Sequence, residues 1–93
     1  MNNYETIIII NSNLEEAVIK ATIQKVTDLI AEHGKVESTE DWGKRKLAYP
    51  IQKQNEGYYV LIQFSSNPDF IDELERIYNI TDEIIKHIIV KKD

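Results

Sequence analysis

The chain has 93 residues, 42% of them hydrophobic, a formal net charge of −5 and no cysteine. This length supports one modest core, so we expect a single domain over residues 1–93. The lack of cysteine excludes a disulfide framework or thiolate metal site and favours a reducing compartment such as the cytoplasm. No apolar run approaches the roughly 18 residues of a membrane span, no leader pattern is present, and the acidic balance argues against a protein that wraps nucleic acid alone.

The first elements are a strand and a helix. Tyr4–Ile10 (YETIIII) predicts a strand whose four consecutive isoleucines place apolar side chains on both faces, because strand side chains alternate. Apolar residues then recur at three-to-four spacing, which predicts a helix over Leu14–His33. We expect its N-cap among Asn11, Ser12 and Asn13 and a C′ residue at Gly34.

A long hairpin follows the first helix. Lys35–Ile51 lacks helical periodicity and predicts a strand, with an irregularity at Trp42 and Gly43 and an edge position at Pro50. The turn QKQNEG leads into Gly57–Phe64 (GYYVLIQF), which is rich in aromatic and β-branched residues and predicts the second strand.

A second helix and a last strand complete the chain. SSNP opens the helix, with Ser66 or Asn67 as its cap and Pro68 at its first position, and Asn79 is a candidate left-handed end. Ile84–Lys91 predicts the last strand.

The order β-α-β-β-α-β predicts an α+β, ferredoxin-like fold, in which two helices cover one face of a four-stranded antiparallel sheet. Two helices leave the other face open, yet the first strand is apolar on both sides. By parity we expect Thr6, Ile8 and Ile10 to face the helices, and Ile7 and Ile9 to lie on the open face. That face then meets either water or a partner.

Basic residues gather in two places. Between Gly43 and Lys53 there are four bases and no acid, and the end of the chain carries three more bases. The first group is compatible with a solvated basic strand or with phosphate binding, for which Trp42 and Tyr49 would add stacking groups. The bases concerned are Lys44, Arg45, Lys46 and Lys53, and then Lys86, Lys91 and Lys92.

The sequence gives little support for other activities. Gly57–Phe64 departs from the RNA-recognition-motif octamer because Val60 and Gln63 stand where stacking aromatics belong. His33 and His87 have no triad partners nearby, so we interpret both as structural. No metal-ligand spacing or glycine-rich phosphate loop is present, so we predict no catalytic residue, no metal and no cofactor.

The chain resembles the bacterial small-subunit ribosomal protein of the S-six family over essentially its whole length. The resemblance rests on YE at Tyr4, DWGKRKLAYPI at Asp41–Ile51, EGYYVLIQF at Glu56–Phe64, DELER at Asp72–Arg76 and the closing KHIIVKK. It departs from the family at Asn2 and Asn3, where an arginine is common. This departure moves the expected RNA contact onto the Gly43–Lys46 segment.

The resemblance implies a non-enzymatic, cytoplasmic protein of the small subunit that binds the central domain of the ribosomal RNA. It implies a heterodimer with the basic ribosomal protein S-eighteen, and neither a membrane nor a small-molecule substrate. The rival interpretation is a ferredoxin-like homodimer that binds or senses a small molecule. The predicted RNA-binding residues are Lys44, Arg45, Lys46, Lys86, Lys91 and Lys92, and the predicted protein-partner face consists of Ile7, Ile9, Trp42 and Tyr49.

Overall fold

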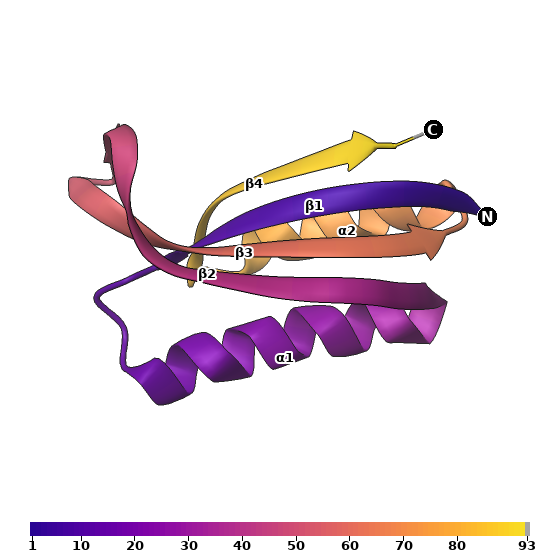
Figure 1. Cartoon of the computed structure of the whole chain (residues 1–93), viewed down its shortest axis with the longest axis horizontal. Coiled ribbons are helices and arrows are strands. Elements are labelled where there is room, and N and C mark those ends of the chain that lie inside the picture. Colours follow the sequence, from indigo (N-terminus) through magenta and orange to yellow (C-terminus); the bar gives the residue numbers. More distant parts are fainter. Residues whose placement is uncertain (93) are drawn as a thin grey trace.

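The computed structural model describes residues 1–92. Its elements follow the predicted order and comprise β1 (Asn2–Asn11), α1 (Glu16–His33), β2 (Gly34–Ile51), β3 (Gln54–Ser66), α2 (Asp69–Ile80) and β4 (Ile84–Lys91). The sheet has the order β2-β3-β1-β4 with every neighbouring pair antiparallel. Figure 1 shows α1 below β2 and α2 behind β1 and β3. The predicted ferredoxin-like α+β fold is confirmed.

The core lies between the helices and one face of the sheet. Thr6, Ile8 and Ile10 of β1 are all 0% exposed, as the alternation predicts. Residues from β3 and both helices complete this core: Val26, Ile30, Val60, Ile62, Phe64, Leu74 and Tyr78. The hydroxyl oxygen of Thr6 lies 3.1 Å from the Tyr78 hydroxyl, and Thr6 donates to the Ile88 carbonyl (2.9 Å). Burial raises the pKa of Tyr78 well above its ordinary value.

The start of α1 differs from the prediction. The helix begins at Glu16 rather than Leu14, and no side chain caps it. Asn11 instead accepts a hydrogen bond from the Asn13 N–H (2.9 Å), which forms a local turn before the helix.

Gly34 ends α1 without the left-handed conformation we expected. Its backbone is extended and begins β2. A Cβ at this position would collide with the Ser65 carbonyl oxygen of β3. Glycine is therefore needed here for close strand approach and not for a helical C-cap.

The second helix also differs at both ends. Pro68 precedes it with helical angles, and no side chain caps it. The Ser66 hydroxyl donates to the Asn67 carbonyl (3.1 Å). Asn79 lies inside the helix, and a left-handed end at this position is wrong. Thr81 closes the helix through its N–H to the Tyr78 carbonyl.

The β2–β3 hairpin carries the predicted irregularity. The register shifts between Asp41 and Gly43, which leaves Trp42 as the extra residue of a bulge, and Gly43 has φ +74°. Gln52 and Lys53 form a two-residue turn with positive φ at both positions (51° and 64°), typical of a type I′ hairpin. Pro50 lies in the edge strand, as expected. Within residues 1–92 neither helix is long and apolar enough to cross a membrane.

Candidate RNA and protein interface

The tip of the β2–β3 hairpin bends across the open face of the sheet. Pairing between β2 and β3 is interrupted after Lys46 and resumes at Ile51, so the residues between them, the arch (residues 47–50), are not in the ladder. Lys86 Nζ donates to the Tyr49 hydroxyl (2.8 Å) and lies 5.2 Å from the centre of its ring. Since β2 and β4 are opposite edges of the sheet, this contact places the arch over the strands between them.

The arch covers part of the open face. Leu47 and Ile9 are both 6% exposed, and a Cβ on Gly57 would meet side-chain atoms of both. Ile9 thus lies on the predicted face, but the protein's own hairpin covers it. The expectation that Ile9 is open to a partner must be corrected, because sequence alternation gives the face of a strand residue but not what later segments lay over it.

The rest of the open face remains uncovered. Ile7 is half-buried, and opposite it on β4 stands Ile88, which is 45% exposed. Val90, two residues further, is 50% exposed. We call Ile7, Ile88 and Val90 the aliphatic strip. Ile88 and Val90 were not among the predicted partner residues, although the alternation of β4 carries the signal that would have found them.

The predicted RNA-binding bases form two groups and not one patch. The basic triplet (Lys44, Arg45 and Lys46) lies on β2 near the hairpin tip. Lys86 of β4 belongs to the same group, because it donates a hydrogen bond to Tyr49 of the arch. Lys91 and Lys92 lie at the other end of the sheet, beside both termini (Figure 1), where Lys92 Nζ is 3.7 Å from Glu5. The hairpin group is the stronger candidate for a continuous contact with RNA.

Within the triplet the side chains alternate. Lys44 and Lys46 stand opposite Tyr58 and Glu56, whereas Arg45 stands opposite Gly57 on the other face. Two of the three bases can therefore reach one phosphate backbone from the same side of the strand.

Trp42 and Tyr49, two further predicted residues, flank the basic triplet along the chain. Trp42 and Tyr49 are 37% and 59% exposed. The Arg45 guanidinium carbon lies 5.7 Å from the centre of the Trp42 ring, and Arg45 Nε donates to the Trp42 carbonyl (3.3 Å). Hydrogen bonding and charge from Lys86 lower the pKa of Tyr49.

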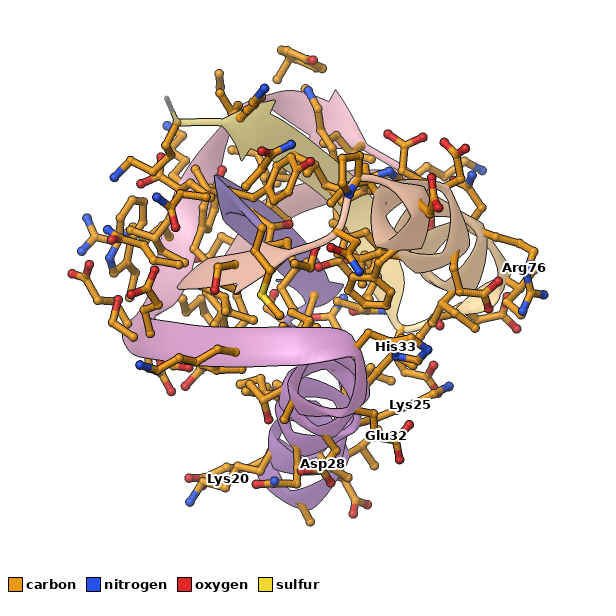
Figure 2. The ribbon with its side chains drawn as sticks, turned by 90° about the vertical axis from the view of Figure 1, so that its right-hand side faces the viewer. Lys20, Lys25, Asp28, Glu32, His33 and Arg76 are labelled. Carbon is orange, nitrogen blue, oxygen red and sulfur yellow. The ribbon has the colours of Figure 1, made fainter. Side chains whose placement is uncertain are left out.

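Negative charge gathers on the helical side. Residues 69–83 contain six acids and one base, while the hairpin from Gly43 to Lys53 has no acid. Figure 2 shows the charged side chains of α1, among them Lys20, Lys25 and Asp28, pointing outward on that side. Such a charge distribution favours the hairpin, and not the helices, as a surface for a polyanion.

Both histidines take part in packing. His33 stacks on Phe70 with ring centres 4.6 Å apart, and His87 lies 4.9 Å from the Tyr78 ring. Among residues 1–92 no group of three or more His, Cys, Asp or Glu side chains could hold a metal ion.

The fold and its surfaces define a class, a ferredoxin-like α+β domain with a basic hairpin and a partly open sheet face. The crystal structure of 30S ribosomal protein S6 from Thermotoga maritima matches this chain with a TM-score of 0.94 and 35% identity. The match covers 98% of this chain and 87% of that chain.

The chain belongs to the ribosomal protein S6 family, whose family model matches residues 3–91. Small ribosomal subunit protein bS6 from Clostridium novyi is 49% identical over 100% of this chain and 99% of its own length. The protein of the same name from Clostridium perfringens is 50% identical with the same coverage. The resemblance seen in the sequence is confirmed: this is a protein of the small ribosomal subunit, in the cytoplasm, with ribosomal RNA and proteins as partners.

Proposed function

We propose that this protein binds the central domain of the small-subunit ribosomal RNA as a heterodimer with ribosomal protein S-eighteen. In this role it supports assembly of that region and translation as a single structural domain, without catalysis, a cofactor or a small-molecule substrate. The observation that carries the proposal is the separation of two surfaces, the aliphatic strip and the basic hairpin. Each surface suits a different kind of partner.

The aliphatic strip suits a protein. Branched aliphatic side chains neither stack on bases nor neutralise phosphates, so their burial is favourable only against other apolar groups. Ile88 and Val90 are about half exposed and border the half-buried Ile7. A partner covering them would remove apolar surface that the two helices and the arch leave in water.

The basic hairpin suits the phosphate backbone. Phosphate contacts come chiefly from Lys and Arg, and the triplet supplies three such groups beside Lys86 and Lys53. The whole chain is nevertheless acidic, at −5. A basic protein partner explains how such a chain can rest on RNA, since the pair would supply the positive field.

A pull-down of the tagged full chain from a lysate, with bound protein and RNA identified, tests this proposal. Ile88→Glu should lose the protein partner, because it would bury a charge in an apolar contact. Ile80→Glu is its matched control, since Ile80 is 62% exposed on α2, away from the strip. This control should keep the partner.

The RNA arm uses two triple variants that remove the same charge. Lys44→Gln/Arg45→Gln/Lys46→Gln should retain the protein partner but recover less RNA. Lys20→Gln/Lys25→Gln/Arg76→Gln removes three bases from the helical side seen in Figure 2 and should recover as much RNA as the unaltered chain. Purification as a free homodimer without RNA would contradict the proposal and favour a small-molecule-binding domain.

A further inference from the structure

The hairpin presents two exposed aromatic rings, and a cation stands beside each. Trp42 has the Arg45 guanidinium carbon 5.7 Å from its ring centre, and Tyr49 has Lys86 Nζ at 5.2 Å. The two cations come from different strands, β2 and β4, so the pairing is not a product of one local sequence. Sites for single-stranded nucleic acid combine exposed aromatic rings with cations. Every nucleobase has a face that can stack on a ring, and every nucleotide has a phosphate that a cation can neutralise.

The backbone keeps this surface accessible. Trp42 is the extra residue of the bulge, and bulges redirect side chains away from the regular alternation. Gly43 beside it has φ +74° with no atom within 4 Å of the position a Cβ would take, so the chain is open there. The Tyr49 ring is displayed by the arch, which leaves it 59% exposed.

Two hydrogen bonds hold the carboxylate of the neighbouring acid, Asp41, in a fixed position. Asp41 accepts from the Gly43 N–H through Oδ1 (3.0 Å) and from the Tyr58 hydroxyl through Oδ2 (2.6 Å). Both carboxylate oxygens are thus already engaged.

We propose that Trp42 and Tyr49 form a stacking site for unpaired RNA nucleotides, with Arg45 and Lys86 holding the adjacent phosphates. This inference rests on the proposed function and deepens it, because it names unpaired nucleotides and not duplex backbone as the ligand of the hairpin. It also reassigns both rings from the predicted protein-partner face. The cations beside both rings attract the phosphates of RNA.

The test uses the full chain, in which Trp42 is the only tryptophan. Oligouridine of about ten nucleotides is titrated at low salt while tryptophan emission is recorded, and the same strand paired with oligoadenosine serves as the duplex probe. Stacking on Trp42 should quench the emission with the single strand and leave it nearly unchanged with the duplex.

Binding of labelled RNA, followed by anisotropy, tests each ring. Trp42→Ala and Tyr49→Ala should each weaken single-strand binding by roughly five-fold or more, the low end for loss of one stacked base. Duplex binding should change by less than about two-fold, since phosphate contacts remain. Tyr49→Phe keeps the ring and should retain most of the affinity, and Ile80→Ala should behave as the unaltered chain.

Three results would overturn the inference. The first is failure of the unaltered chain to bind oligouridine. The second is an equal loss of affinity for the single strand and the duplex in Trp42→Ala and Tyr49→Ala. The third is a Trp42 emission that responds to S-eighteen and does not change with RNA. The last result would return both rings to the protein interface. If the pull-down still recovers ribosomal RNA, only the stacking site fails; if it recovers none, the proposed function fails as well.

Discussion

Alanine substitution of three successive isoleucines of β1 should separate the two sides of the sheet. Replacing Ile by Ala removes three carbons, about 2.4 kcal/mol of transfer free energy when the side chain is fully buried. Ile8 is 0% exposed in the tight helix-side core, where a residual cavity raises the expected loss to about 4 kcal/mol. Ile9 is 6% exposed beneath the arch, which can settle onto the gap, so about 2.5 kcal/mol is expected. Half-buried Ile7 should lose only about 1 kcal/mol.

Urea unfolding followed by circular dichroism measures these three losses in free energy of unfolding. The predicted order is Ile8→Ala, then Ile9→Ala, then Ile7→Ala. An Ile9→Ala loss no larger than that of Ile7→Ala would show that the arch does not cover Ile9 in solution. An Ile7→Ala loss equal to that of Ile8→Ala would refute the assignment of the two faces.

Three further predictions concern the hairpin and the end of α1. Lys86 lowers the pKa of Tyr49, so this phenol should ionise below the ordinary tyrosine value in an ultraviolet absorbance titration. Lys86→Met should raise the pKa of Tyr49. An unchanged pKa in this variant would mean that the arch does not contact Lys86 in solution. The hydrogen bond to Asp41 raises the pKa of Tyr58 to about 12, so its contribution to stability is complete below about pH 10 and is lost as the pH rises toward 12. Tyr58→Phe should flatten that part of the stability–pH curve, and an unaltered curve would contradict the assignment. Gly34→Ala should lower the free energy of unfolding by about 2 kcal/mol or more through its collision with the β3 backbone, and a loss below about 0.5 kcal/mol in a thermal melt would refute that contact.

Local patterns in the sequence predicted most of the elements. The Ile84–Lys91 strand has the bounds we expected, because a short β-branched run between turns has few alternatives. Gly43 within a strand pattern indicated the bulge, and alternation in β1 gave the correct side for Thr6, Ile8 and Ile10. These features depend on residues adjacent in the chain.

Helix ends were predicted less well for a physical reason. Several polar residues precede each helix, and each can bond to the backbone in more than one way. Asn11 closes a turn before α1, and Ser66 bonds to the next carbonyl before α2. The sequence shows that a cap is available but not which bond forms.

The arch could not be predicted from the sequence. It depends on a break in pairing between Lys46 and Ile51 and on a contact between Tyr49 and Lys86, which are 37 residues apart and on opposite edges of the sheet. Periodicity describes a strand in isolation and contains no information about a distant segment lying over it. For this reason the sequence placed Ile9 at a partner interface.

The salt dependence of RNA binding tests the central claim most directly. Binding of the chain together with S-eighteen to a central-domain ribosomal RNA fragment is measured over a range of salt concentrations, for the unaltered chain and for Lys44→Gln/Arg45→Gln/Lys46→Gln. If at least two of the three bases contact phosphates, the slope of log affinity against log salt should fall in magnitude by about 1.5 to 2. An unchanged slope and affinity would show that the hairpin does not meet RNA and would contradict the account.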